Sequence, residues 1–173
     1  MTNFILHVAI SLDGYIARLD GDIDWLPSSE EGGEDNGYGK FYNSIDALVM
    51  GATTYEQVLG FGDWPYPGKL SYVLTSRNLS TVRTDTFFVK GGVEEVVEDV
   101  NKKGYKRVWL VGGGKLASSF INRGLVDEYI IAVIPTILGS GISLYQSVLE
   151  LKLDLIEVKS YSSGVAELRY KKK

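Results

Sequence analysis

The sequence predicts a three-layer α/β domain with a mostly parallel central sheet and an antiparallel edge. Strand-like and helix-like segments alternate along most of the 173 residues, a pattern typical of parallel strands with helices on both faces. Two alternating segments joined by a short turn close the chain, and they predict an antiparallel C-terminal hairpin. Neither an internal repeat nor a linker divides the sequence, so we expect a single domain over residues 1–173.

Composition excludes several kinds of site. The chain has no cysteine and one histidine, which excludes a disulfide framework, a thiolate metal site and a cysteine nucleophile. That histidine, His7, lies in an apolar strand pattern, where we expect it to be packed or at an edge rather than to bind a metal. The net charge of −4 argues against a nucleic-acid surface. No apolar run is long enough to cross a bilayer, and we expect a cytoplasmic protein.

The first half of the chain predicts two strands, two helices and a long loop. Asn3–Leu12 has the composition of a strand, and Asp13-Gly14 ends it with a turn. Ser28–Gly39 is polar and rich in glycine, so we expect a loop there. The elements after this loop are a helix over Lys40–Ile45, a strand over Ala47–Met50 and a helix over Thr54–Leu59.

The second half adds four strands, two helices and the hairpin. Valines recur at helical spacing from Val93 to Val100 with acidic residues between them, which predicts an amphipathic surface helix that ends near Gly104. The other expected elements are strands over Leu70–Thr75, Thr86–Val89, Arg107–Val111 and Asp127–Leu138, a helix over Leu116–Asn122, and a hairpin of Leu153–Tyr161 with Val165–Tyr170.

Three strand ends carry residues that suit the phosphates of a ligand. Ligands of open α/β sheets bind at the carboxyl ends of the strands. Gly51–Thr54 places hydroxyls at a helix N-terminus, where free N–H groups can meet an anion. Thr75–Arg77 joins two hydroxyls to a planar cation. Gly112–Gly114 bares the backbone just before another helix.

Each of these motifs also has a simpler explanation. Threonines often cap helices, Arg77 also fits a surface turn, and Gly112–Gly114 also suits close packing of a strand on a helix. The glycine spacing matches neither usual nucleotide signature. Because a sheet of this kind brings the three strand ends together, their coincidence predicts a site for a ligand with two phosphate groups.

In this order, the motifs resemble the dihydrofolate reductase superfamily, and more closely its branch typified by the reductase domain of bifunctional riboflavin-biosynthesis proteins (RibD C-terminal-like). The matching segments cover nearly the whole chain: ISLDGYIA, DWLP, ALVMGATTYE, YVLTSR and VWLVGGGKLASSFINRGLVDEYIIAVIPTILGSGISLY. The resemblance implies a dihydrofolate-reductase-like fold in a stand-alone domain. It also implies an oxidoreductase that uses NADPH to reduce a small heterocyclic or carbonyl substrate, as 5-amino-6-(5-phosphoribosylamino)uracil reductase does in riboflavin biosynthesis.

The resemblance assigns cofactor roles by position. For the nicotinamide it implies Ala9, Ile16 and Gly112; for the pyrophosphate Gly51, Thr53, Thr54, Gly113, Gly114, Lys115 and Leu116; and for the adenosine ribose and its 2′-phosphate Ser76 and Arg77, with Thr75 beside them. Folate reductases usually carry arginine where Ala52 stands. Arg77 and Lys115 are therefore the cations left to favour NADPH over NADH.

The substrate side is less well defined by sequence. Trp25 stands where the family keeps a tryptophan near the substrate. A reduction of C=N or C=O also needs a proton, for which Asp13, Asp24, Glu30 and a bound water are candidates, although aspartate in an Asp-Gly turn is often structural. Ser28–Gly39 is interpreted either as a lid over the substrate or as a surface loop.

The match to the riboflavin-pathway reductase is imperfect at the substrate side. Tyr15 stands where that reductase usually has lysine or arginine, and the 28–39 loop is acidic. A folate or pterin reductase, a non-catalytic nucleotide-binding module and a structural interaction domain therefore stay open as alternatives. Members of the riboflavin-pathway branch often pair through their sheet edges, so the resemblance implies a homodimer, for which the apolar, alternating C-terminal hairpin is the candidate edge.

Overall fold

The computed structural model describes residues 1–27 and 35–173, which build one eight-stranded sheet and a small two-stranded one. The strands are β1 (Asn3–Ser11), β2 (Tyr15–Ala17), β3 (Ala47–Gly51), β4 (Leu70–Leu74), β5 (Thr86–Val89), β6 (Arg107–Gly112), β7 (Glu128–Ile134), β8 (Ile142–Ser143), β9 (Leu153–Ser160) and β10 (Ala166–Lys172). The helices are α1 (Tyr38–Ser44), α2 (Ala52–Leu59), α3 (Val93–Lys102) and α4 (Gly114–Asn122).

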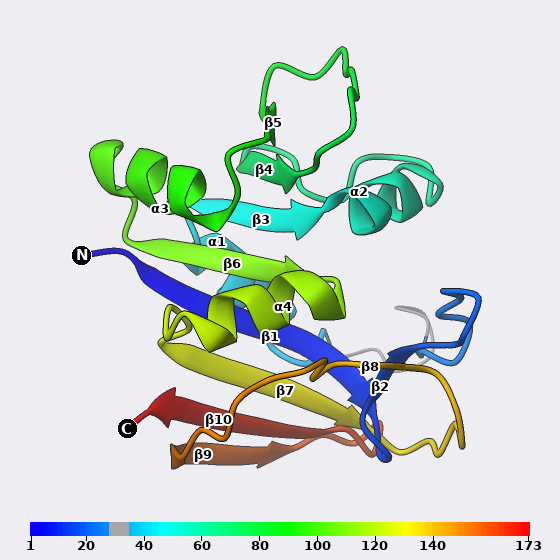
Figure 1. Cartoon of the computed structure of the whole chain (residues 1–173). Coiled ribbons are helices and arrows are strands. Elements are labelled where there is room, and N and C mark those ends of the chain that lie inside the picture. Colours follow the sequence, from blue (N-terminus) through cyan, green and yellow to red (C-terminus); the bar gives the residue numbers. More distant parts are fainter. Residues whose placement is uncertain (28–34) are drawn as a thin grey trace.

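The large sheet is parallel over six strands and antiparallel at one end. Its order is β5-β4-β3-β6-β1-β7-β10-β9. Neighbours from β5 to β7 run parallel, whereas β10 runs antiparallel to both β7 and β9 (Figure 1). Because consecutive parallel strands need crossovers, helices cover both faces of this part. The predicted fold class is thereby confirmed.

Two apolar clusters form the core, one on each face of the sheet. Side chains from α3 and α4 pack with Phe4 and Leu6 of β1 on one face. Side chains from α1 and α2 pack with Ile5 of β1 on the other face. This division follows from the period of two along a strand, which sends neighbouring residues of β1 to opposite faces.

The element boundaries differ from the sequence prediction in ways that have local causes. β7 ends at Ile134 rather than Leu138, because Pro135 lacks the N–H that a central strand needs. Helices α1, α2 and α4 each begin two residues before their predicted starts. The predicted 28–39 loop is shortened accordingly; its residues 28–34, with the candidate proton donor Glu30, lie outside the described residues.

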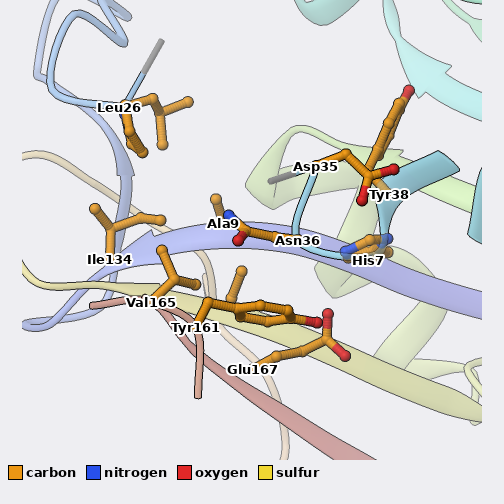
Figure 2. Close-up of a pocket in the computed structure, with 12 residues that line it drawn as sticks. His7, Ala9, Leu26, Asp35, Asn36, Tyr38, Ile134, Tyr161, Val165 and Glu167 are labelled. Atoms are coloured by element: carbon orange, nitrogen blue, oxygen red, sulfur yellow. The ribbon is translucent and has the colours of Figure 1, made fainter. Parts of the chain in front are cut away.

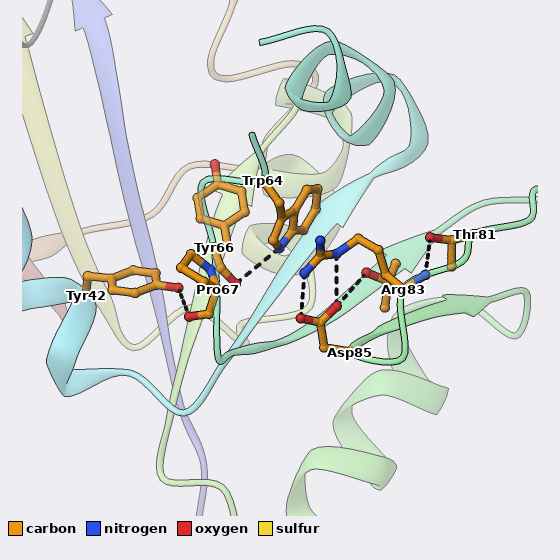
Figure 3. Close-up of polar contacts among 8 residues, drawn as sticks. Tyr42, Trp64, Tyr66, Pro67, Thr81, Arg83 and Asp85 are labelled. Carbon is orange, nitrogen blue, oxygen red and sulfur yellow. Dashed lines mark hydrogen bonds and ion pairs between the residues drawn. The ribbon is translucent and has the colours of Figure 1, made fainter. Parts of the chain in front are cut away.

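Polar contacts hold the segment between α2 and β4 against its neighbours (Figure 3). The Tyr42 hydroxyl of α1 donates a 2.9 Å hydrogen bond to the carbonyl of Pro67. The Trp64 indole donates to the carbonyl of Tyr66 at 3.1 Å. Arg83 lies over the Trp64 ring and pairs with Asp85 at 2.7 Å. The first of these contacts ties α1, which carries Tyr38 of the pocket described next, to the segment before β4.

Within the described ranges, no helix has the length and apolar character that a membrane span requires.

Candidate functional site

The three predicted motifs lie on neighbouring strands of the sheet. β4, β3 and β6 are adjacent, and their register pairs Gly51 with Leu74 and Met50 with Gly112. The carboxyl ends of these three parallel strands lie at the same end of the sheet. They therefore place Gly51–Thr54, Thr75–Arg77 and Gly112–Gly114 side by side there. The structure thus brings together the residues that the sequence assigned to phosphate groups.

The first and third motifs meet directly. A Cβ added at Gly113 would lie 3.5 Å from Oγ1 of Thr54. The caps of α2 and α4 are Gly51 and Gly113, and neither helix has a side-chain hydrogen bond to its first N–H groups. Two helix N-termini with uncapped N–H groups therefore lie near each other, an arrangement that favours negative charge.

Each glycine of Gly112–Gly114 has a distinct role. Gly112 and Gly113 have φ of 136° and 67°, which side-chain-bearing residues rarely adopt. A Cβ on Gly114 would lie 2.6 Å from the carbonyl oxygen of Ser143 and in contact with the amide of Gln146. Gly114 is therefore explained by internal packing, whereas a Cβ on Gly112 would meet open space.

The second motif carries a cation that already has a partner. Both terminal nitrogens of Arg77 bind the carboxylate of Glu56 in α2, at 2.8 and 3.0 Å. Hydrogen bonds from Arg77 hold the pKa of Glu56 below its usual range. The turn itself is fixed because the Arg77 N–H donates to Oγ1 of Thr75. Any anion that approaches Arg77 therefore competes with a carboxylate.

The other residues assigned to the cofactor lie around these strand ends. Lys115 is exposed in the first turn of α4. Leu116 and Ile16 pack against the core on the α3 and α4 face, so their side chains contribute packing. These assignments stay predictions.

Strand β1 separates from β6 toward the same edge of the sheet. In the observed register the two strands are paired from Asn3–Arg107 to Leu6–Leu110, after which β1 continues with β7 as far as Ser11 and Ile134. The carboxyl half of β1, which contains Ala9, is therefore no longer paired with β6. Gly112, the last residue of β6, lies at the same end of the sheet.

A pocket of about 240 Å³ opens over β1, β7 and β10 on the α1 face (Figure 2). Its apolar lining is Ala9, Leu26, Pro27, Ala132, Ile134 and Val165. Its polar lining is His7, Asp35, Asn36, Tyr38, Tyr161 and Glu167. Ala9, Ala132 and Glu167 lie in one row across the three strands. The two alanines leave space above the sheet, and Ala9 joins the pocket to the predicted cofactor residues.

A carboxylate lies buried at one end of this pocket. Glu167 of β10 is 4% exposed, and its Oε1 accepts a 2.9 Å hydrogen bond from Nε of Arg169. The phenol of Tyr161 extends to the same end (Figure 2). Burial and the nearby Glu167 raise the pKa of Tyr161 above its usual range, so its hydroxyl keeps its proton at neutral pH.

His7 forms the wall between this carboxylate and helix α1. Its ring packs edge-on against Phe41 at 4.2 Å between centroids. Burial and the charge of Arg169 lower the pKa of His7 from 6.5 to about 4, so the imidazole is neutral at neutral pH. His7 is thus packed, as the sequence led us to expect, and it also lines the pocket.

Two of the candidate proton donors make contacts outside the pocket. Asp13 accepts hydrogen bonds from Ser11 and from the backbone N–H groups of Leu138 and Gly139. These bonds, led by that from Ser11, hold the pKa of Asp13 below its usual range. Asp24 pairs with Arg18. Trp25 precedes Leu26 of the lining, and its indole N–H has no partner among the described residues.

Sequence analysis missed most of the polar pocket residues. Glu167 alternates with Ala166 and Leu168 in a strand pattern, which places it on the opposite face from Leu168. The sequence does not show that this face lies beside β7 and β1. The burial of the Glu167 carboxylate could therefore not be predicted. Tyr38 and Asp35 fell in the predicted loop, and Tyr161 at the end of a predicted strand.

Within residues 1–27 and 35–173, His, Cys, Asp and Glu side chains form no group of three or more that could hold a metal ion.

Known proteins share this arrangement over the whole chain. The uncharacterized protein YwjB of Bacillus subtilis (strain 168) is 38% identical over 168 residues, covering 96% of this chain and 95% of YwjB. A solved structure from Shewanella sp. PV-4, provisionally named a riboflavin biosynthesis protein, has a TM-score of 0.87 at 31% identity and covers 100% of this chain and 99% of its own.

A more distant structure shares the fold. The Thermotoga maritima diaminohydroxyphosphoribosylaminopyrimidine deaminase/5-amino-6-(5-phosphoribosylamino)uracil reductase has a TM-score of 0.75 at 18% identity, over 99% of this chain and 57% of its own. The sheet order, the helices on both faces and the antiparallel end define a dihydrofolate-reductase-like α/β domain. The RibD C-terminal domain model matches residues 3–166, and the chain belongs to that family.

Proposed function

We propose that the protein is a reductase that binds NADPH along the ends of β4, β3 and β6 and reduces a small heterocyclic or carbonyl substrate in the pocket over β1 and β7. The observation that carries this proposal is the meeting of three phosphate-suited motifs at the carboxyl ends of β4, β3 and β6, next to strand β1, whose Ala9 lines the pocket. Substrate and cofactor would then face each other across the carboxyl half of β1.

The residues present fit a dinucleotide. Added Cβ atoms at Gly51 and Gly112 would meet open space, so a ligand can approach the bare backbone there. The N-termini of α2 and α4 supply N–H groups, and Thr53 and Thr54 supply hydroxyls for the pyrophosphate. Arg77 supplies a cation for the 2′-phosphate, and Lys115 supplies one beside the pyrophosphate.

The cofactor, when bound, supplies the hydride. The chain binds and orients it through the strand ends, and the apolar floor of Ala9 and Ala132 excludes water from the reacting face. Asp13, Asp24 and Trp25 stay candidates for the chemistry. The name of the Thermotoga maritima protein includes reduction of a phosphoribosylamino uracil, and we propose a reaction of the same type on a heterocycle of pyrimidine size.

Thermal unfolding with each nicotinamide cofactor tests this function. A ligand that binds the native state alone raises the unfolding midpoint, so we expect NADPH to raise it by several degrees. We expect a smaller rise with NADH, which lacks the 2′-phosphate, and a loss of this difference in Arg77→Ala. If neither cofactor raises the midpoint, the proposal fails. NADPH binding without oxidation across pyrimidine, pterin and carbonyl compounds would favour a non-catalytic nucleotide-binding module instead.

We further propose that the protein forms a homodimer through the outer part of the antiparallel end. β9 is an edge strand, and Leu155, Ile156 and Val158 on it are more than half exposed. Leu149 and Leu151, just before β9, are also exposed. An apolar edge of this kind favours association. Sedimentation of the wild type and of Val158→Lys checks this, with a dimer expected for the first and a monomer for the second.

A further inference from the structure

The buried carboxylate of Glu167 is a feature that the proposed reductase does not yet use. A buried carboxylate needs compensation by hydrogen bonds or by a cation. Arg169 provides one hydrogen bond, to Oε1, and is also 3.8 Å from Glu157 on the neighbouring strand. The Arg169 guanidinium is thus shared between two carboxylates, while Glu167 lines the pocket.

The other polar side chains that line the pocket carry no positive charge at neutral pH. Oδ1 of Asn36 and Nδ1 of His7 are buried and have no hydrogen-bond partner among the described residues. The carboxylate of Asp35 accepts from the backbone N–H groups of Gly37 and Gly39, at 2.9 Å each. A ligand in this pocket therefore meets the carboxylates of Glu167 and Asp35 and the amide oxygen of Asn36, which accept hydrogen bonds, and a neutral imidazole, which has one donor and one acceptor nitrogen.

The cation beside the pocket, Arg169, is already paired with Glu167 and does not line the pocket. None of its twelve lining residues in the described chain is lysine or arginine. His7 is neutral at neutral pH, since burial and Arg169 lower its pKa to about 4. A dianionic phosphate, which binds well to charged donors, would here meet Glu167 and Asp35.

The floor of the pocket favours a planar ring. It is formed by Ala9 and Ala132, whose small apolar side chains suit the face of a single ring. The volume of about 240 Å³ accommodates such a ring. A ring that carries a ribose phosphate needs a cationic clamp in addition.

Given the proposed reductase, we propose that its pocket binds an uncharged, unphosphorylated ring of pyrimidine size whose N–H groups face the Glu167 carboxylate, and that it excludes anionic substrates, phosphate esters included. The substrate class of this chain then differs from that named for the Thermotoga maritima reductase.

Calorimetric titration with uracil and orotate tests this inference. The two probes share one ring with N–H donors, and orotate adds a carboxylate. The titrations are made without cofactor, so they can be interpreted even if NADPH does not bind. We expect uracil to bind the wild type and orotate to bind at least about ten-fold more weakly. Glu167→Gln removes the charged acceptor, and the affinity for uracil should therefore fall by at least about ten-fold in this variant.

Glu157→Gln is the matched control. It removes the other carboxylate near Arg169 without altering the pocket lining, and it should bind uracil as the wild type does. Should Glu167→Gln not fold, Ala132→Leu replaces it, because leucine fills the floor and should abolish uracil binding.

Three results would overturn the inference: no uracil binding to the wild type at 10 mM, orotate binding as tightly as uracil, or unchanged uracil affinity in Glu167→Gln or Ala132→Leu. NADPH binding, measured on the same samples, tests the proposed reductase function separately.

Discussion

The two halves of the candidate site are built in different ways. On the side of β4, β3 and β6, short runs such as Gly51–Thr54 and Gly112–Gly114 follow the strands directly, and the parallel sheet brings them together. On the side of β1, β7 and β10, single side chains such as His7 and Glu167 converge from distant segments. The first half offers N–H groups and cations, whereas the second offers a buried carboxylate. This contrast underlies the two proposals, that the first half binds the phosphates of a cofactor and that the second binds an uncharged ring.

The largest effect that separates the halves should come from Gly51→Val. The φ of Gly51 is −80° and its Cβ direction is open, so the fold accepts valine with a loss of up to about 1 kcal/mol at the N-cap. The side chain occupies the path to the N–H groups of α2. We expect NADPH affinity to fall about 100-fold or more while uracil affinity stays constant, both measured by calorimetry. Unchanged NADPH affinity would remove the α2 N-terminus from the cofactor site.

The next effect concerns the uncharged character of the pocket half. Because the pKa of His7 is lowered from 6.5 to about 4, the unfolded chain binds a proton at this residue over that range and the folded chain does not. Stability should therefore fall as the pH drops from about 6.5 toward 4, by about 2 kcal/mol between pH 7.5 and pH 5 from this group alone.

Urea unfolding of the wild type and of His7→Phe at both pH values isolates that contribution. When the pH is lowered from 7.5 to 5, the free energy of unfolding should fall by about 2 kcal/mol more in the wild type than in the variant. Equal losses in the two proteins would mean that His7 titrates normally, and the pocket would then acquire a cation near pH 6.

A smaller effect is expected from Asp13, a candidate proton donor outside the pocket. Its carboxylate joins the end of β1 to the backbone of Leu138 and Gly139. Asp13→Ala should therefore lower the thermal midpoint by a few degrees, whereas Asp20→Ala, which removes an aspartate from an exposed turn, should change it less. Equal midpoints for wild type and Asp13→Ala would contradict the structural role and strengthen the catalytic one.

The smallest effect should come from Glu56→Gln on the cofactor half. Glu56 engages both terminal nitrogens of Arg77, and this exposed pair is weak. Its removal frees the guanidinium for a 2′-phosphate, so the preference for NADPH over NADH should rise by a few-fold in a calorimetric comparison. A lower preference in Glu56→Gln would show that the glutamate orients Arg77 for the phosphate.

The same contrast explains how far the sequence could predict the site. Gly112–Gly114 and Thr75–Arg77 are each a continuous run of residues, and a parallel sheet brings the ends of its strands together. The clustering of these runs at the ends of β4, β3 and β6 could therefore be predicted from the sequence. The pairing of Arg77 with Glu56 was not, because it joins a loop to a helix across 21 residues. Glu167 could be placed on a face of its strand, but its burial depends on the pairing of β10 with β7, which local periodicity does not determine.

The fold shows the same limit. Alternation predicted nearly every strand and helix, whereas the pairing of β2 with β8 was missed because Tyr15–Ala17 is too short to give a period. Packing of the 143–146 segment against Gly114 was missed as well. A run of glycines does not show which distant segment of the chain packs against it.

The central claim is that both halves meet at Ala9, so that a ring in the pocket faces the nicotinamide. The most direct test is an interligand nuclear Overhauser measurement on the protein with NADPH and uracil bound together, each at a concentration that calorimetry shows to saturate its site. We predict transfer between the uracil ring protons and the proton at C4 of the nicotinamide, lost in Ala132→Leu. Transfer to the adenine protons instead, or none while both ligands are bound, would contradict the account.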